Sequence, residues 1–368
     1  MSRMSIFGLL FRYFAKRHLL WTGLCLFGLT AIVSIIQVVE LIRRVSVLKN
    51  NNVDVNFLIL SMLNLPAVID VVLPFALLCG SMLCFNTLNK TNEFIVTRGM
   101  GTSIWTALYP AFAAAFGVGL FFVMVINPIG SFTAKQYEKQ MVKIFGTDDR
   151  NLSVTADGIW LRDRRDDRQL IIHGDALDAV NVSIINPVIY QFATSGELQT
   201  RLRGSAMLLT DTGWMIEDTV AWDNDGGRKE IGTLMISTNI ATLDIERSTE
   251  PPHTIPVYTL PRFIEMLENT GLPTINHSIH FHQLLALPLL LVGITMLGAR
   301  FTLRNVNKGR RMQLFTRGVL IATAIFIYGY FMQILGSTFR VPPAVAGWAP
   351  AATILLTGAA LLARLDES

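Results

Sequence analysis

Six long stretches of the chain are apolar and almost free of charge. They lie at residues 19–39, 55–89, 99–134, 269–299, 318–339 and 341–363. A helix that crosses a bilayer needs about 20 mostly apolar residues, and each stretch is long enough to supply them. We read the first stretch as an uncleaved span, because it is too long for the apolar part of a signal peptide. The pattern therefore predicts an α-helical membrane protein with six transmembrane helices.

Between the third and fourth stretches the pattern changes to short apolar segments separated by polar and glycine-rich breaks. Segments that predict strands lie at 158–162, 169–173, 180–185, 188–192, 206–210, 213–217 and 233–237. Many short, evenly spaced strands are typical of an antiparallel sandwich or jelly roll. Residues 135–145 before this region and 258–271 after it are predicted to be helical.

Three domains follow from this pattern. Residues 1–130 hold spans one to three and a short amphipathic helix near 88–100, residues 131–275 hold the β domain with its flanking helices, and residues 276–368 hold spans four to six. Charge divides the chain in the same way. Residues 127–279 carry a net charge of −7, whereas the rest carries +11. An acidic insert in a basic, apolar body excludes a nucleic-acid-binding chain.

Lysine and arginine in the short loops predict the orientation. With the N-terminus inside, the inner segments 1–18, 86–103, 300–317 and 364–368 carry thirteen basic residues, whereas the outer loops carry four. Because basic residues accumulate on the cytoplasmic side, both termini are expected inside and the β domain outside.

Cysteines and motifs exclude several classes of protein. All three cysteines lie in the apolar stretches, so the β domain holds no disulfide and no thiolate metal site. The sequence has no G-x-x-x-x-G-K-[ST] loop and no Gly-Lys dipeptide. We therefore expect no enzyme and no cofactor or metal in this chain, and any ATP hydrolysis must occur in a partner.

Some polar residues near the spans could carry function. Asp70 lies inside the second stretch, either at the outer headgroup level or facing a cavity. Arg43 and Arg44 lie just past the outer end of the first span, where they either bind anionic groups or only contact headgroups. The triplet His277, His280 and His282 resembles a metal site only weakly, and we expect no metal there.

Two inner loops could contact other molecules. The loop 89–101 predicts a small helix that ends at Gly99 or Gly101. Its apolar side chains would be covered either by a cytosolic partner or by the inner leaflet. The basic loop 300–311 is expected to contact anionic membrane lipids.

Several motifs resemble the LptF/LptG (YjgP/YjgQ) family of permeases, and the LptG half of it more closely. The most specific are Pro66-x7-Pro74 followed by Asn92-Glu-Phe-Ile-Val-x-Arg-x-x-Gly101, which resemble the family's second span and coupling helix. Residues 158–163 resemble the start of its β-jellyroll, Arg310 and Arg317 match two arginines before its fifth span, and Pro342-Pro343 precedes the last span.

The resemblance implies a function. The family's permeases form an LptF–LptG pair on an ATPase dimer, LptB, which uses ATP. With LptC, the complex extracts lipopolysaccharide from the bacterial inner membrane toward a periplasmic bridge to the outer membrane. By this resemblance the residues that couple to the ATPase are Glu93, Phe94, Arg98 and Gly101. The expected lipid contacts are Gln37, Glu40, Arg43, Arg44 and Arg317, and the expected jellyroll lining is Ile159, Leu161, Ile171, Val182, Ile184 and Tyr190.

The sequence departs from the family at two family lysines, which are replaced here by Gln37 and Ala67. Two other classes of protein fit the layout less well. A mechanotransmitter like FtsX or MacB has four spans, and a periplasmic sensor or assembly scaffold needs a larger cytosolic part than this chain provides.

Overall fold

A computed structural model describes residues 3–47, 56–145, 152–155, 158–164, 168–178, 183–193, 198–210, 213–223, 227–237, 250–269, 272–303, 311–338 and 340–366. The chain divides into two compact units. Unit 1 contains Met1–Phe145, His253–Tyr258 and Ser278–Ser368, and unit 2 contains Gly146–Pro252 and Thr259–His277.

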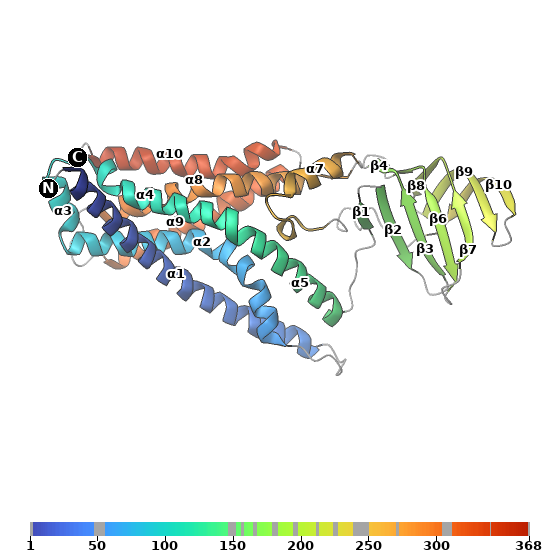
Figure 1. Ribbon diagram of the computed structural model, residues 1–368, viewed down its shortest axis with the longest axis horizontal. Helices are drawn as coiled ribbons and strands as arrows, with labels where there is room; N and C mark the ends of the chain where they lie inside the picture. The colour runs from blue at the N-terminus through green and yellow to red at the C-terminus, as the bar shows by residue number, and fades with distance from the viewer. Residues whose placement is uncertain are drawn as a thin grey trace. The chain divides into compact units, whose positions relative to one another are not determined.

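Unit 1 is helical (Figure 1). Its helices are α1 (Arg3–Val47), α2 (Phe57–Lys90), α3 (Glu93–Gly99), α4 (Ile104–Phe121), α5 (Asn127–Phe145), α8 (Ile275–Leu303), α9 (Arg311–Ser337) and α10 (Pro343–Asp366). Among the described residues, five helices are long and apolar enough to cross a membrane, and Thr323–Ser337 of α9 is a shorter apolar segment. The expected membrane body is thus confirmed, and α9, the fifth expected span, is the least complete.

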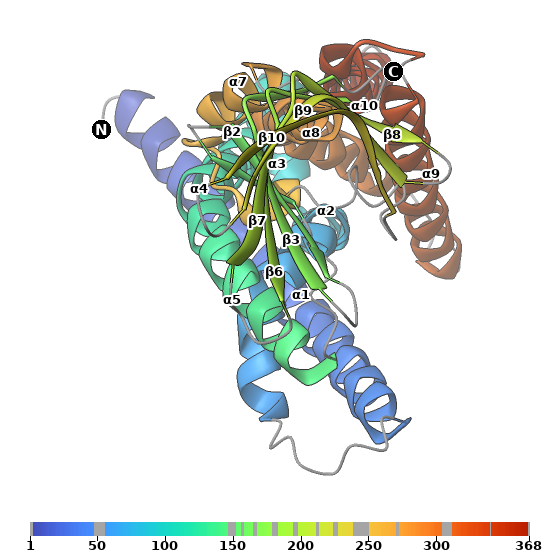
Figure 2. The ribbon, with the colours of Figure 1, turned by 90° about the vertical axis from the view of Figure 1, so that its right-hand side faces the viewer.

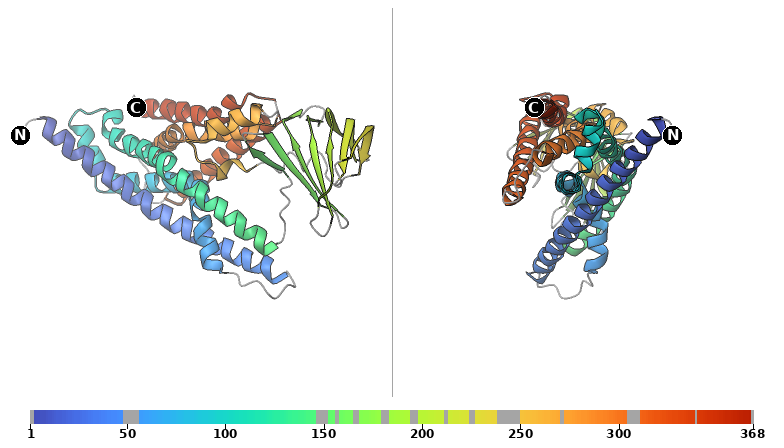
Figure 3. Two further views of the ribbon diagram at one scale, coloured as in Figure 1. Left: turned by 45° about the vertical axis from the view of Figure 1, so that its right-hand side comes forward. Right: turned by 90° about the vertical axis from the view of Figure 1, so that its left-hand side faces the viewer.

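Local sequence signals explain where these helices begin. The side chain of Asn56 accepts a hydrogen bond from the Ile59 backbone N–H and caps α2, and Ser103 caps α4 through the Thr106 N–H. A π-helical turn, η1 (Phe122–Ile126), connects α4 to α5 without a break. The result is a single rod, which Figure 3 shows in cyan to green.

Small residues allow the helices of unit 1 to pack closely. A Cβ atom on Gly80 of α2 would lie 2.6 Å from Cα of Thr22 on α1, and one on Gly119 of α4 would lie 2.6 Å from Cα of Pro288 on α8. Such contacts are typical of helices that pack within a membrane. By contrast, many apolar side chains of α1 and α9 are exposed, including Phe27.

Unit 2 contains one antiparallel sheet, which is curled (Figure 2). Its strands are β1 (Leu152–Thr155), β2 (Gly158–Arg164), β3 (Arg168–Gly174), β4 (Ala176–Asp178), β5 (Ser183–Ile185), β6 (Val188–Ala193), β7 (Leu198–Arg203), β8 (Ala206–Thr210), β9 (Gly213–Asp223) and β10 (Arg228–Ile236). Their order is β1-β2-β3-β6-β7-β9-β8-β5-β4, and β10 pairs with β9.

The sheet buries one face. Apolar side chains from that face, with Trp214 fully buried among them, pack against Leu267 and Phe263 of the amphipathic helix α7 (Leu260–Asn269). Expected strands such as 188–192 and 206–210 are present, whereas β1, β4 and β7 were not predicted. An inserted antiparallel β domain in a helical membrane body confirms the expected fold class.

Candidate functional site

The helix α3 lies at the end of unit 1 where α1 begins and where α8 and α10 end. Phe94 of α3 packs in one buried cluster with Phe14 of α1, Leu303 of α8 and Leu362 of α10. The chain enters α3 through Asn92, whose φ of 58° is left-handed, and leaves it through Gly101, whose φ is 82°. The Gly101 N–H donates to the Arg98 carbonyl, as expected where a glycine ends a helix.

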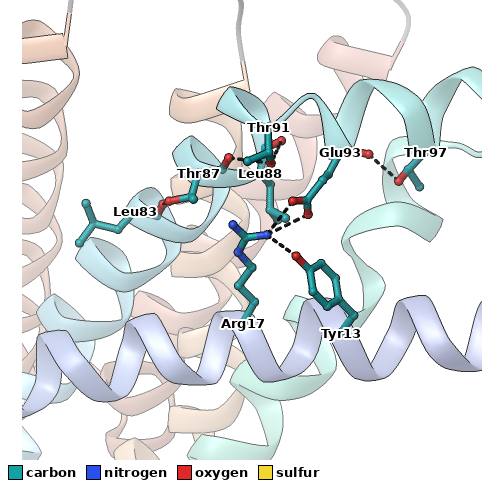
Figure 4. A network of polar contacts seen from close by, with 8 residues as sticks. All are labelled: Tyr13, Arg17, Leu83, Thr87, Leu88, Thr91, Glu93 and Thr97. Atoms are coloured by element: carbon teal, nitrogen blue, oxygen red, sulfur yellow. Dashed lines mark hydrogen bonds and ion pairs between the residues drawn. The ribbon is translucent and has the colours of Figure 1, made fainter.

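A polar network attaches α3 to α1 (Figure 4). Nη1 of Arg17 lies 2.9 Å from both carboxylate oxygens of Glu93, and the same nitrogen donates to the Tyr13 hydroxyl. The Thr97 hydroxyl donates to the Glu93 carbonyl. The sequence identifies Arg17 only as one of the inner basic residues, because a pairing across 76 positions leaves no local signal.

The network changes the acidity of Glu93. Partial burial alone would raise the pKa of Glu93, but hydrogen bonds from Thr91 and Arg17 and the positive charge of Arg17 outweigh this effect. The pKa of Glu93 therefore lies below its ordinary value of 4.5. At neutral pH the carboxylate is charged and stays paired.

The other side of α3 presents apolar side chains outward. Ile95 is 54 % exposed, Val96 63 % and Met100 58 %. Phe94, in contrast, is buried within this chain. Of the four residues expected to couple to a partner, Phe94 is buried under α3 and Glu93 pairs with Arg17. Arg98 is exposed, and Gly101 follows the end of the helix.

The expected lipid contacts on α1 lie close together near its C-terminal end. Arg43 donates to both carboxylate oxygens of Glu40 at 2.8 Å, and Arg44 donates to one of them at 3.0 Å. One turn earlier, Gln37 accepts a hydrogen bond from Asn64 of α2 at 2.8 Å. Both arginines are exposed, so their remaining N–H groups can reach an anionic ligand.

Arg317 does not join this group. It lies in the second turn of α9, which starts only eight residues after α8 ends. Leu303 at the end of α8 packs with Phe14 near the start of α1. Arg317 is thus near the opposite end of the helical unit from Arg43 and Arg44, and the geometry does not unite them in one site.

The expected jellyroll lining is divided between the two faces of the sheet. In the strand register Leu161 pairs with Ile172, which pairs with Ile189, and this row is buried. Ile171 and Tyr190 form the neighbouring row and point to the other face, because successive side chains alternate. There the Arg201 guanidinium lies 5.7 Å from the Tyr190 ring centroid.

The expectation of one common lining is therefore corrected. Leu161 and Ile184 belong to the buried core, whereas Ile171 and Tyr190 are only half-buried. The reason is that Ile171 and Ile172 are both apolar, so the sequence does not reveal which of them faces inward. Val182 and the side chain of Ile159 lie outside the described residues.

The structure places Asp70 at a cavity in unit 1. The cavity has a volume of about 340 Å³ and is lined by α2, α8, α9 and α10. His280 also lines it, whereas His282 accepts a hydrogen bond from the Trp348 indole N–H and His277 contacts the Glu250 carbonyl. The three histidines thus have separate surroundings, and no group of metal-binding side chains is found among the described residues.

Comparison with known proteins identifies the family. Residues 12–364 match the family described as lipopolysaccharide export system permease LptF/LptG. A search of curated proteins found no match. The family match covers both units, including α3 and the sheet. The chain therefore belongs to the LptF/LptG family of lipopolysaccharide export permeases.

Proposed function

We propose that this chain is the LptG-like permease subunit of a transporter that extracts lipopolysaccharide from the inner membrane. In this proposal it pairs with an LptF-like permease, and α3 docks on an LptB-like ATPase dimer that hydrolyses ATP. The lipid passes from the membrane to the β unit and on to an LptC-like bridge protein. Both termini lie in the cytoplasm and the β unit in the periplasm.

The observation that carries the coupling role is the construction of α3. One side of this short helix is buried and tied to α1 by the Arg17–Glu93 ion pair, while Ile95, Val96 and Met100 face outward. Outward apolar side chains on a rigidly held helix suit a protein partner, because a preorganised surface loses little freedom on binding. A displacement of α3 by the partner would also pull on α1.

The docking role is tested by purifying the tagged full-length chain from native membranes in mild detergent and identifying the proteins that accompany it. We expect an ATPase to co-purify, and Val96→Glu to reduce its amount by about tenfold. Leu198→Glu, a similar change at an exposed apolar residue of β7, is the matched control and should have no effect. Undiminished ATPase with Val96→Glu would show that α3 is not the docking element.

The lipid path rests on the exposed arginines near the end of α1. Arginine forks match the phosphate groups of lipopolysaccharide. A photo-crosslinking amino acid at position 43 or 44 should trap lipopolysaccharide in cells. The same amino acid at position 265, on the exposed side of α7, should trap none. Equal yields at all three positions would contradict this path.

Family membership does not favour the mechanotransmitter or the sensor. The fewer cationic groups at the lipid site, with Gln37 and Ala67 in place of family lysines, are consistent with a lipid A of altered charge or with compensation by the partner permease.

A further inference from the structure

The cavity of unit 1 has a polar end and an apolar end. Its lining includes five polar side chains that come from three helices: Asp70 of α2, His280 and Gln283 of α8, and Tyr330 and Gln333 of α9. The rest of the lining is apolar or glycine. Among the residues that the structure describes, no lysine or arginine lines it, and Asp70 is its only carboxylate.

The polar side chains gather at one level because of the directions of the helices. The helices α2 and α8 run in parallel. In each of them the polar lining residues lie nearer the N-terminal end, and the apolar Leu78 and Ile294 lie further along, deeper in the bundle. On α9, which runs the opposite way, Phe326 comes first and Tyr330 one turn later. The rings of Phe75 and Phe326 lie 5.8 Å apart, which fixes this register.

The polar level corresponds to one surface of the membrane. Asp70 precedes Lys90, the last residue of α2, by twenty positions, which is about 30 Å along a helix. This length equals the hydrocarbon thickness of a typical bilayer, about 30 Å. With Lys90 at one interface, Asp70 lies at the other, and the apolar wall extends from it into the hydrocarbon region.

The carboxylate of Asp70 is available to a ligand. Among the residues that the structure describes, it makes no hydrogen bond and no ion pair closer than 4 Å. His253 interacts with it electrostatically but lies 3.4 Å from the carboxylate of Glu138. A carboxylate with hydroxyl and amide neighbours at an interface suits a cationic group that donates hydrogen bonds.

We propose that this cavity binds a membrane phospholipid with an ammonium headgroup, with the ammonium at Asp70 and an acyl chain along Phe75, Leu287 and Ile294. The cavity is within the range of small-ligand sites. Tyr330 and Phe326 are 60 % and 52 % exposed, so a lipid can enter from the side of the bundle. This site does not depend on the proposed transport of lipopolysaccharide.

The test is native mass spectrometry of the full-length chain in mild detergent, titrated with phosphatidylethanolamine or phosphatidylglycerol of identical acyl chains. The two lipids share the phosphate, which carries an ethanolammonium group in the first and an uncharged glycerol group in the second. We expect phosphatidylethanolamine to bind about tenfold more tightly. Asp70→Asn should remove this preference, whereas Glu265→Gln, which neutralises an exposed carboxylate elsewhere, should preserve it. Equal binding by the unaltered chain, or a preference that survives Asp70→Asn, would overturn the proposal.

A second pair of variants tests the cavity itself. Gly329 lines the cavity, and a Cβ on it would meet no atom within 4 Å, so Gly329→Leu fills the space without a clash at Cβ. It should weaken the binding of both lipids by about tenfold. Gly117→Leu on α4 is the control, because Gly117 also has open space but does not line the cavity. Unchanged binding with Gly329→Leu would show that the lipid binds elsewhere.

Discussion

Arg17 of α1 and Glu93 of α3 form an ion pair in which one guanidinium nitrogen lies 2.9 Å from both carboxylate oxygens. The two side chains are 20 % and 30 % exposed, so water screens their attraction less than at an open surface. A helix of seven residues is too short to be stable alone. The pair and the buried Phe94 therefore hold α3 in place.

We expect this ion pair to stabilise α3 measurably. Arg17→Gln and Glu93→Gln should each lower the protection of α3 amides against hydrogen exchange by about 1 kcal/mol. The double variant should lose less protection than the sum of the losses in the two single variants, with a coupling energy of about 1 kcal/mol. Hydrogen exchange of the full chain in detergent measures all three variants. Strictly additive losses would mean that the two side chains do not act together.

The same pair makes α3 sensitive to acid. Hydrogen bonds and the charge of Arg17 hold the pKa of Glu93 below its ordinary value of 4.5, although burial opposes them. The stabilisation is thus fully present above pH 4.5 and is lost as the pH falls through the pKa of the folded state. Protection of α3 should decrease in that acidic window, and Glu93→Gln should abolish the decrease. A decrease that persists in this variant must come from another group.

Two glycines on α4 should respond in opposite ways to the same substitution. Gly119→Ala places a Cβ 2.6 Å from Cα of Pro288, and separating the helices should cost about 1–3 kcal/mol of stability. Gly117→Ala has open space and should be neutral or stabilise α4 by up to about 1 kcal/mol. Thermal unfolding in detergent compares the variants. Equal effects would argue against close packing of α4 on α8.

Asn127 stabilises the segment that returns to the helical unit. Its side-chain oxygen accepts a hydrogen bond from the buried Val257 N–H at 2.9 Å. Asn127→Ala leaves this N–H without that partner and should lower the free energy of unfolding by about 1–3 kcal/mol. Asn64→Ala removes an exposed hydrogen bond to Gln37 and should change stability by less than about 0.5 kcal/mol. Chemical unfolding of both variants tests the difference, and similar losses would refute it.

Glu40 competes with any anionic ligand for Arg43 and Arg44, because it accepts hydrogen bonds from both. Glu40→Gln should therefore raise the affinity of the purified protein for lipopolysaccharide by about two- to threefold. Glu265→Gln changes the net charge equally, but on α7 of unit 2 rather than on α1, and should have no effect. A loss of affinity with Glu40→Gln would mean that the carboxylate positions the two arginines for the ligand rather than competing with the ligand for their N–H groups.

The sequence predicted those features that depend on patterns within a few turns. The length of the apolar stretches located the membrane helices, and the turn residues between short apolar segments located most strands. The short helix is expected to end at Gly99 or Gly101, and α3 ends at Gly99. The faces of the sheet could not be assigned, since Ile171 and Ile172 are both apolar and only their register with β6 distinguishes them.

Contacts between distant segments could not be predicted. The sequence singles out Asp70 and His280 as polar residues in or near apolar stretches, but it gives no such signal for Tyr330 and Gln333. Whether these side chains lie at the same depth in the bundle depends on which helices pack together and on the direction in which each helix runs. The pairing of Arg17 with Glu93 depends likewise on α1 and α3 meeting at one end of the helical unit.

The π-helical turn between α4 and α5 keeps the buried residues of both helices on the same side of the rod. Gly119, Val123, Asn127 and Ser131 are all buried, at a spacing of four residues. On a regular α-helix this spacing would rotate the buried side by about 40° per step, or about 120° in all. The additional residue of the π-helical turn reverses about 100° of this rotation. Deleting one residue from Phe122–Ile126 would therefore convert the turn to a regular α-helix with Gly119 and Asn127 still on one side, so that the contact with Pro288 and the hydrogen bond with Val257 both persist.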